Sequence, residues 1–287
     1  MANKQITKQW LDATIQNNFI FGKTLETYPD LCRRLLELIL NVKISEINYP
    51  EREKTINLRS DSKGIRLDVY VEEKGTNRSF DIEMQVSNSD NLAKRTRYYQ
   101  ELIDGDKLKP GQHYSVLGES IIIFICPFRF KYNRHFYSFH ERCDQELDFI
   151  LESGVTKIFL STKGTIDDVS PEIKAFLDYV DSSVVSSNFV KELDDAVQLV
   201  KSNRKAMKEF MTYQMALLEE RLQGEQRGRA QGIELGRTEG TESVAIKLIR
   251  RGRPIQEIHE DTGLPIQRIQ QLAKKNEHIN FIQEKNS

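Results

Sequence analysis

Three oxygen-bearing side chains on two neighbouring segments form the pattern in this sequence that could carry out chemistry. Asp68 lies in the segment GIRLDVYVEE, and Glu83 and Gln85 lie two residues apart in SFDIEMQV. Both segments alternate apolar and polar residues with a period of two, which predicts two β-strands. We therefore expect Asp68, Glu83 and Gln85, together with Asp81, to project from one polar face of a hairpin that lines a cleft. The opposite face would pack into the core.

Two carboxylates and an amide in this arrangement suit metal-dependent hydrolysis of a phosphodiester. A hard divalent cation prefers oxygen ligands, activates water and stabilises charge on the leaving oxygen. Asp68 and Glu83 are the candidate metal ligands, and Gln85 is the candidate residue that orients the attacking water. Repulsion between two neighbouring carboxylates raises their pKa values unless a cation is bound, so an acidic pair itself indicates a metal. On spacing alone, an ordinary charged strand surface remains the alternative.

The elements that must position these residues follow from hydrophobic periodicity. Leucine and isoleucine recur at helical spacing in residues 30–40, after Pro29, and a second helix is predicted from residue 91 to its end at Gly105. A hairpin loop is expected at residues 75–77. The predicted strands are residues 64–71, 79–86, 120–126 and 156–161. This order of strands and helices implies an α/β or α+β fold with a mixed central sheet.

The last hundred residues differ from the preceding region in composition and in residue pattern. Five glycines recur at every fourth position, namely Gly224, Gly228, Gly232, Gly236 and Gly240. A glycine inside a helix costs about 1 kcal/mol relative to alanine. The tract is therefore either a flexible linker or a helix with a stripe free of side chains, along which two helices approach closely.

Residues 241–287 are predicted to form a helix, a short helix, a turn and a helix, as in a helix-turn-helix unit. Residues 221–253 contain eight Arg or Lys and four Glu, which makes them the candidate phosphate-contacting arm. A solvated helical surface or a protein-contact module remains the alternative for this basic stretch.

Composition narrows the class of protein. The chain has 287 residues, of which 30% are charged and 38% apolar, with a net charge of −1, so any contact with nucleic acid must be local. The three cysteines, Cys32, Cys126 and Cys143, form no CxxC pair, which indicates reduced thiols. The most apolar run, residues 121–126, is far shorter than the ~20 residues of a membrane helix. We expect a cytoplasmic protein without a membrane segment.

The first region resembles the Rpn family of recombination-promoting nucleases and transposases, within the PD-(D/E)XK superfamily. The similar segments are NNFIFGKTLETYPDLCRRLLELIL, GIRLDVYVEE, FDIEMQVSNSDNLAKRTRYYQELIDGDKLKPGQHYSVL and IIIFICPF. The combination of Asp68, FDIEMQ and RTRYY is the most specific part. The glycine tract and the tail AIKLIRRGRPIQEIHEDTGLPIQRIQQL are also similar to tails of that family.

This resemblance implies a restriction-endonuclease-like core and a Mg²⁺-dependent DNA endonuclease, with Mn²⁺ as an alternative ion, linked to recombination or mobile DNA. Asp68 and Glu83 match the acidic residues of the family, and Gln85 stands where the superfamily pattern has Lys. Neutral Gln offers a hydrogen bond but no charge to the transition state. Arg95 and Arg97, on the following helix, are the candidates for that charge and for DNA contact, with ordinary surface arginines as the alternative.

We expect three parts: a PD-(D/E)XK nuclease-like domain (residues 1–187), a helical arm (188–240) and a small helix-turn-helix-like region (241–287). DNA is the expected partner, and a homodimer through the C-terminal helices would suit double-strand cleavage. Two alternatives remain open. One is a weak or inactive nuclease fold that binds DNA or protein, and the other is a nuclease that acts on RNA.

Overall fold

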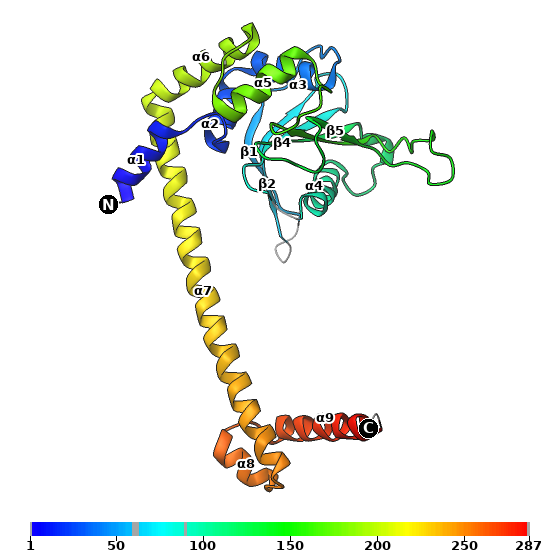
Figure 1. Ribbon diagram of the computed structural model, residues 1–287, viewed down its shortest axis with the longest axis vertical. Helices are drawn as coiled ribbons and strands as arrows, with labels where there is room; N and C mark the ends of the chain where they lie inside the picture. Colours follow the sequence, from blue (N-terminus) through cyan, green and yellow to red (C-terminus); the bar gives the residue numbers. More distant parts are fainter. Residues whose placement is uncertain (1, 59–62, 89–90, 286–287) are drawn as a thin grey trace. The chain divides into compact units, whose positions relative to one another are not determined.

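The structure is a computed structural model that describes residues 2–58, 63–88 and 91–285, and the chain divides into two compact units between Thr212 and Tyr213 (Figure 1). The helices of the first unit are α1 (Ala2–Asp12), α2 (Asn18–Thr27), α3 (Pro29–Leu40), α4 (Leu92–Lys107), η1 (a 3-10 turn, Tyr114–Val116), α5 (Pro171–Ser182) and α6 (Asn188–Ser202). Its strands are β1 (Glu51–Ile56), β2 (Ile65–Glu72), β3 (Ser79–Met84), β4 (Ser120–Cys126), β5 (Phe136–Phe139) and β6 (Val155–Ser161). Helix α7 (Arg204–Arg250) begins in the first unit, and α8 (Ile255–Thr262) and α9 (Ile266–Lys285) belong to the second.

Within the described residues, six strands form one mixed sheet in the order β1-β2-β3-β4-β6-β5. The pairs β1–β2 and β2–β3 are antiparallel, the pairs β3–β4 and β4–β6 are parallel, and β5 closes the edge antiparallel to β6. The fold is α/β with C-terminal helices, as the sequence predicts. The carboxyl ends of β3, β4 and β6 therefore lie at one edge of the sheet.

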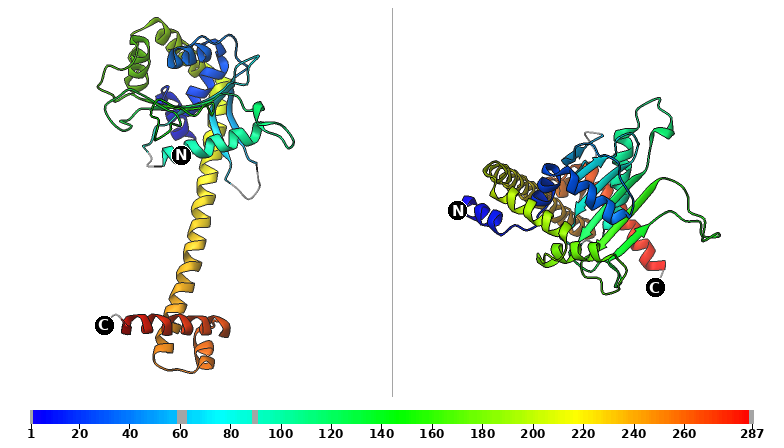
Figure 2. Two further views of the ribbon diagram at one scale, coloured as in Figure 1. Left: turned by 90° about the vertical axis from the view of Figure 1, so that its right-hand side faces the viewer. Right: turned by 90° about the horizontal axis from the view of Figure 1, so that it is seen from above.

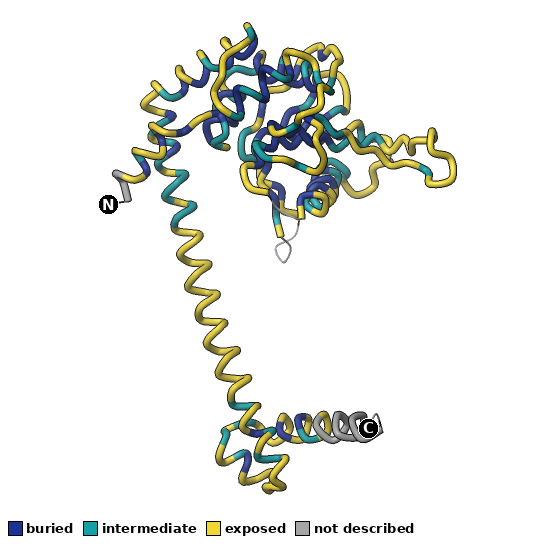
Figure 3. The backbone as a smooth tube through the Cα atoms, viewed as in Figure 1, coloured by how far each residue is buried: buried dark blue, intermediate teal, exposed yellow. Residues whose placement is uncertain are grey.

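Helices cover both faces of this sheet. Figure 2 shows α4 on one face, and α2, α3, α5 and α6 on the other. This cover explains why every residue of β4 is buried: the continuous apolar run SIIIFIC needs an apolar neighbour on each side (Figure 3). On the α4 side, Phe124 packs with Leu92, Leu102 and Phe159 in one hydrophobic cluster.

The predicted helix at residues 30–40 is confirmed as α3, which ends at Asn41 in the left-handed conformation. The prediction that the next helix ends at Gly105 is wrong, because α4 continues to Lys107. Helices tolerate an isolated glycine, and a Cβ at position 105 would lie 2.4 Å from Leu58 Cδ1. Strand β3 ends at Met84, so Val86, expected in the core, is half exposed.

All five glycines of the tract lie within α7, so the tract is helical. A Cβ added at any of the five would meet no atom within 4 Å. The alternative of a flexible linker is therefore wrong in this structure. The pairing of two such helices stays a prediction, and so does the three-part division of the chain. Among the described residues, no helix combines the length and the apolar character needed to cross a membrane.

The second unit has a small core of its own. Ala245 at the end of α7, Ile258 on α8, and Ile269 and Leu272 on α9 are buried against one another. Helix α8 ends at Gly263, whose φ of 69° is the left-handed conformation that permits a sharp turn. This arrangement confirms the predicted order of helix, short helix, turn and helix.

Substitution of Gly118 tests how closely the β2–β3 hairpin packs against the segment before β4. A Cβ at this position would lie 2.2 Å from the backbone oxygen of Asn77, and a backbone atom cannot move aside by changing rotamer. We expect Gly118→Ala to lower the free energy of unfolding by about 1–3 kcal/mol in urea titrations. Gly224→Ala, at an exposed helical site, is the control and should raise helix stability by about 1 kcal/mol. Equal stability of Gly118→Ala and the wild type would contradict this packing.

Candidate functional site

Asp68 and Glu83 lie opposite each other where the β2–β3 ladder ends. The ladder runs to the pair Val69–Ile82, and the next pair in that register is Asp68–Glu83. Here the side chains take over the cross-strand bonds: Asp68 N–H donates to Glu83 Oε1 (2.8 Å), and Met84 N–H donates to Asp68 Oδ2 (2.9 Å). The strands therefore fix each carboxylate beside the backbone of the other.

Helix α2 brings Asn18 to the same place. The side chain of Asn17 caps this helix by accepting from Phe19 N–H and Ile20 N–H. Asn18 Nδ2 then donates to Asp68 Oδ1 (3.1 Å) and Oδ2 (3.0 Å). Gly22 permits the close approach, because a Cβ there would lie 2.8 Å from Arg52 Cγ. The sequence pattern alone did not predict that Asn18 holds Asp68.

Arg95 on α4 links the remaining site residues. Its Nη2 donates to Glu83 Oε2 (2.7 Å), its Nη1 donates to Gln85 Oε1 (2.6 Å), and its Nε donates to the hydroxyl of Tyr99 (2.8 Å). The guanidinium carbon lies 5.3 Å from the centre of the Phe124 ring. Gln85 is held at its other end, since its Nε2 donates to Ser87 O.

The structure brings together Asp68, Glu83, Gln85 and Arg95 but leaves Arg97 apart. Arg97 is two residues beyond Arg95 on the same helix and is exposed to solvent. Tyr99 is buried in the hydrophobic cluster beneath α4, and its hydroxyl accepts a hydrogen bond from Arg95 Nε. Of the two arginines predicted to supply charge, only Arg95 contacts the site residues.

The expectation that this polar face lines an open cleft is wrong for β3. Glu83 is 1% exposed and Gln85 is 7% exposed, whereas Asp68 is partly exposed. The physical reason is that α4 lies over the polar face of the hairpin and covers β3, which is buried along its whole length. Access from solvent is therefore on the Asp68 side of the pair.

Burial sets the protonation of the two carboxyls. Burial, followed by repulsion from Asp68, raises the pKa of Glu83 to about 8, although Arg95 opposes this shift. Burial also raises the pKa of Asp68, while the N–H of Met84 and the amide of Asn18 act in the opposite direction. A cation bound between the two carboxyls would relieve this repulsion, so the raised pKa values of Glu83 and Asp68 fit a metal site.

Asp81 is a third carboxyl on this face. It is 1% exposed, and neither of its oxygens accepts a hydrogen bond from a donor among the described residues. Burial and then repulsion from Glu83 and Asp68 raise its pKa well above the usual range. The alternation in FDIEMQ placed Asp81 on the Glu83 face, but the pattern did not indicate that it would be buried.

Asp68 and Glu83 are the two carboxyl groups that could hold a cation here. In the part of the chain that the structure describes, no group of three His, Cys, Asp or Glu side chains is placed to hold a metal ion. This still suits Mg²⁺, which proteins often hold through one or two carboxylates together with water and substrate phosphate. The arrangement can thus hold a hard cation at Asp68 and Glu83 next to the positive charge of Arg95.

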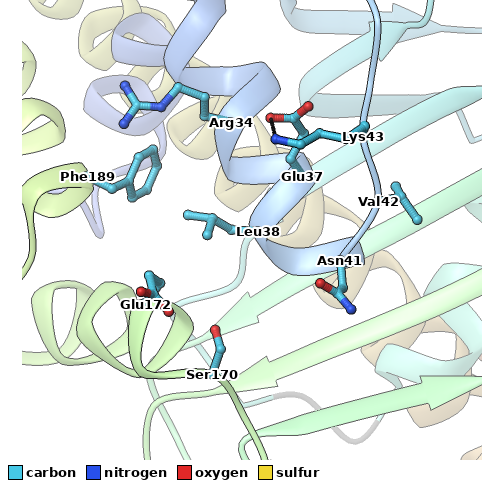
Figure 4. Close-up of a pocket in the computed structure, with 9 residues that line it drawn as sticks. All are labelled: Arg34, Glu37, Leu38, Asn41, Val42, Lys43, Ser170, Glu172 and Phe189. Carbon is cyan, nitrogen blue, oxygen red and sulfur yellow. Dashed lines mark ion pairs between the residues drawn. The ribbon is translucent and has the colours of Figure 1, made fainter.

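A surface pocket of about 510 Å³ lies elsewhere, between α3 and the α5–α6 region (Figure 4). It shares no residue with the carboxylate pair. Three of its charged groups are paired: Arg34 binds Glu192, outside the drawn set, and Lys43 lies 3.9 Å from Glu37. This pocket therefore offers no catalytic group comparable with Asp68 and Glu83.

Comparison with known proteins gives one result. A sequence model of the family described as PD-(D/E)XK nuclease family transposase matches residues 18–166, which is just over half of the chain. The match begins at Asn18 and includes β1 to β6, and thus every residue of the site. No curated protein and no solved structure matches the chain.

The raised pKa of Glu83 predicts how the stability of the metal-free protein depends on pH. The folded state keeps the proton up to about pH 8, whereas the unfolded state loses it near the ordinary value of 4.5. Between these values the folded state binds more protons, so raising the pH lowers the free energy of unfolding. We expect Glu83→Gln to reduce this slope by up to about 1.4 kcal/mol per pH unit, measured by urea unfolding in EDTA.

Glu101→Gln, on the exposed face of α4, is the matched control and should leave the slope unchanged. The slope should persist in part in Glu83→Gln, because Asp81 acts in the same direction. A Glu83→Gln variant with the full wild-type slope would contradict the assigned protonation.

Proposed function

The chain belongs to the PD-(D/E)XK nuclease family of transposases, and from this premise we propose that it is a metal-dependent endonuclease that hydrolyses phosphodiester bonds in DNA. The observation that carries this proposal is the Asp68–Glu83 pair, in which each carboxylate is fixed by the backbone of the neighbouring strand. Such rigid placement is what catalysis by positioning requires.

Asp68 and Glu83 are the proposed metal ligands, with Mg²⁺ as the expected ion and Mn²⁺ as a substitute. When bound, such an ion lowers the pKa of water and neutralises charge on the phosphate and the leaving oxygen. Asn18 keeps Asp68 oriented, and the N–H of Asp68 keeps Glu83 oriented. The partial exposure of Asp68 supports entry of the substrate from that side.

Arg95 is the proposed source of the positive charge that Gln85 cannot supply. Its guanidinium lies between the carboxylate of Glu83 and the amide oxygen of Gln85, above the ring of Phe124. Gln85 uses its oxygen to accept from Arg95, so we assign it the task of positioning Arg95 instead of orienting water. Arg95 would then stabilise the charge that develops on the phosphate in the transition state.

The second unit is proposed to contact DNA and a second copy of the chain. Arg250, Arg251 and Arg253 are exposed around the turn between α7 and α8, where they can meet phosphates. The helical glycine stripe of α7 supports a homodimer, which would place two sites on one duplex. A role in recombination or in movement of mobile DNA follows from this proposal.

A DNA-binding module without cleavage is the second candidate. The observation that favours it is the ion pair of Arg95 with Glu83 (2.7 Å), which satisfies this carboxylate without a metal ion. The two candidates differ in whether DNA is cut when a divalent ion is added.

Substitution of the carboxylates tests the nuclease assignment. We expect Asp68→Asn and Glu83→Gln each to lower the rate of plasmid cleavage in Mg²⁺ by about 100-fold or more, because each removes a negative ligand. EDTA should have the same effect on the wild type. Asp167→Asn, an exposed carboxylate, is the matched control and should cut normally. Cleavage by Asp68→Asn at the wild-type rate would rule out this site.

A second test separates the two arginines of α4. We expect Arg95→Ala to lower the cleavage rate by about 100-fold, since it removes a preorganised positive charge. Arg95→Lys should recover little, because one ammonium nitrogen cannot reach the three separate acceptors that the planar guanidinium spans. Arg97→Ala is the matched control, with a rate expected to stay within about threefold of the wild type. Equal losses for Arg95→Ala and Arg97→Ala would contradict the role given to Arg95.

A further inference from the structure

The segment after β4 combines aromatic and basic residues without any acidic one. Residues 127–140 read PFRFKYNRHFYSFH and contain Arg129, Lys131 and Arg134 together with six aromatic side chains. The net charge of the whole chain is −1, so this run is a local exception. We use the name β4–β5 loop for its first part, residues 127–135.

This loop starts at the edge of the sheet that carries the carboxylate pair. Glu83 on β3 pairs in register with Phe124 on β4, and the two strands run parallel. The β4–β5 loop leaves β4 three residues after Phe124. Phe124 stacks on Phe159 (5.5 Å between ring centres), and Phe159 stacks on Phe130 of the loop (4.3 Å). A continuous row of rings thus connects Arg95 to the loop on the α4 face.

The backbone of the loop is fixed, so its outer side chains are presented in a defined way. Ser161 Oγ donates to Phe128 O (2.7 Å), and His135 N–H donates to Asp168 Oδ1 (2.9 Å). Phe128 and Phe130 pack inward against the hydrophobic cluster. Arg129 and Lys131, between and after them, point to solvent, and no described acidic side chain pairs with either.

Tyr132 faces solvent as Arg129 and Lys131 do: its side chain is 79% exposed although it is large and aromatic. Exposed aromatic rings beside basic groups are the features with which proteins bind single strands: bases stack on the rings, and phosphates meet Arg and Lys. In a duplex the bases are stacked on each other and cannot reach such a ring without flipping or unpairing.

We propose that the β4–β5 loop binds an unpaired stretch of a DNA strand beside the cleavage site, with Tyr132 stacking on a base and Arg129 and Lys131 on phosphates. This inference rests on the proposed function and narrows it, since the substrate then carries a single-stranded or frayed segment next to the scissile bond. The ring of Tyr132 gives affinity for any base, so the contact selects unpaired DNA without selecting a sequence.

Binding without cleavage tests the inference. Fluorescence anisotropy of the full chain in EDTA would compare a labelled strand of about 16 nucleotides, a duplex of the same sequence and the matching RNA strand. We expect Tyr132→Ala to weaken binding of the DNA strand by about fivefold or more and of the duplex by less than about twofold. Tyr132→Phe should bind as the wild type does. Tyr114→Ala is the matched control, because Tyr114 is 76% exposed at the opposite end of β4.

The basic residues have a separate readout. Replacing both Arg129 and Lys131 by Ala should reduce the salt dependence of strand binding, as the slope of log K against log salt, by about 1.4. Lys43→Ala, at a lysine whose side chain is 96% exposed in the α3–β1 segment, should not change the slope.

Three results would overturn the inference: strand binding unaffected by Tyr132→Ala, equal losses for strand and duplex, or tighter binding of RNA than of DNA with the same dependence on Tyr132. Because no metal is present, these results are independent of the cleavage tests of Asp68. Lost cleavage in Asp68→Asn together with unchanged strand binding in Tyr132→Ala would leave the nuclease standing and remove only the loop assignment.

Discussion

The end of the β2–β3 ladder is the constraint on which the site depends. At this point two carboxylates, those of Asp68 and Glu83, accept the backbone N–H groups that would otherwise lack a partner. A buried N–H must be satisfied, so the fold itself requires an acceptor at both positions. The same bonds hold two carboxyl groups side by side, where burial raises the pKa of both and repulsion from Asp68 adds to the rise at Glu83. The two N–H groups therefore require both side chains as acceptors, whereas the repulsion between these side chains is unfavourable.

The surroundings resolve this conflict in two ways. Arg95 places a positive charge against Glu83, and its guanidinium carbon lies 4.8 Å from the centre of the Tyr99 ring and 5.3 Å from that of Phe124. Burial beside two other carboxyls raises the pKa of Asp81, which disfavours a third negative charge at this place. The helix that supplies Arg95 also closes the hydrophobic cluster over β4. Position of the charge and packing of the core are therefore set by one element, α4.

The sequence predicted the parts of this account that depend on local pattern. Alternation of apolar and polar residues gave strands β2 and β3, and the apolar run SIIIFIC gave β4. It also placed Asp68 and Glu83 on one face. It could not show that α4 covers that face, since burial of Glu83 arises from contacts between segments far apart in the sequence. The charged strand β1 (EREKTI) and the short edge strand β5 were missed because edge strands carry a weak hydrophobic signal. The sequence left Arg95 and Arg97 as equal candidates for the charge, and the contacts of Arg95 with Glu83 and Gln85 separate them.

The central claim is that Asp68 and Glu83 hold a divalent ion, and crystals grown with Mn²⁺ test it most directly. Anomalous diffraction at the manganese edge locates the ion without relying on activity. The account predicts one peak bound by a carboxylate oxygen of Asp68 and one of Glu83, with Arg95 turned from Glu83 towards the phosphate site. Ordered carboxylates without a peak between them, with the Arg95–Glu83 ion pair intact at saturating Mn²⁺, would contradict it.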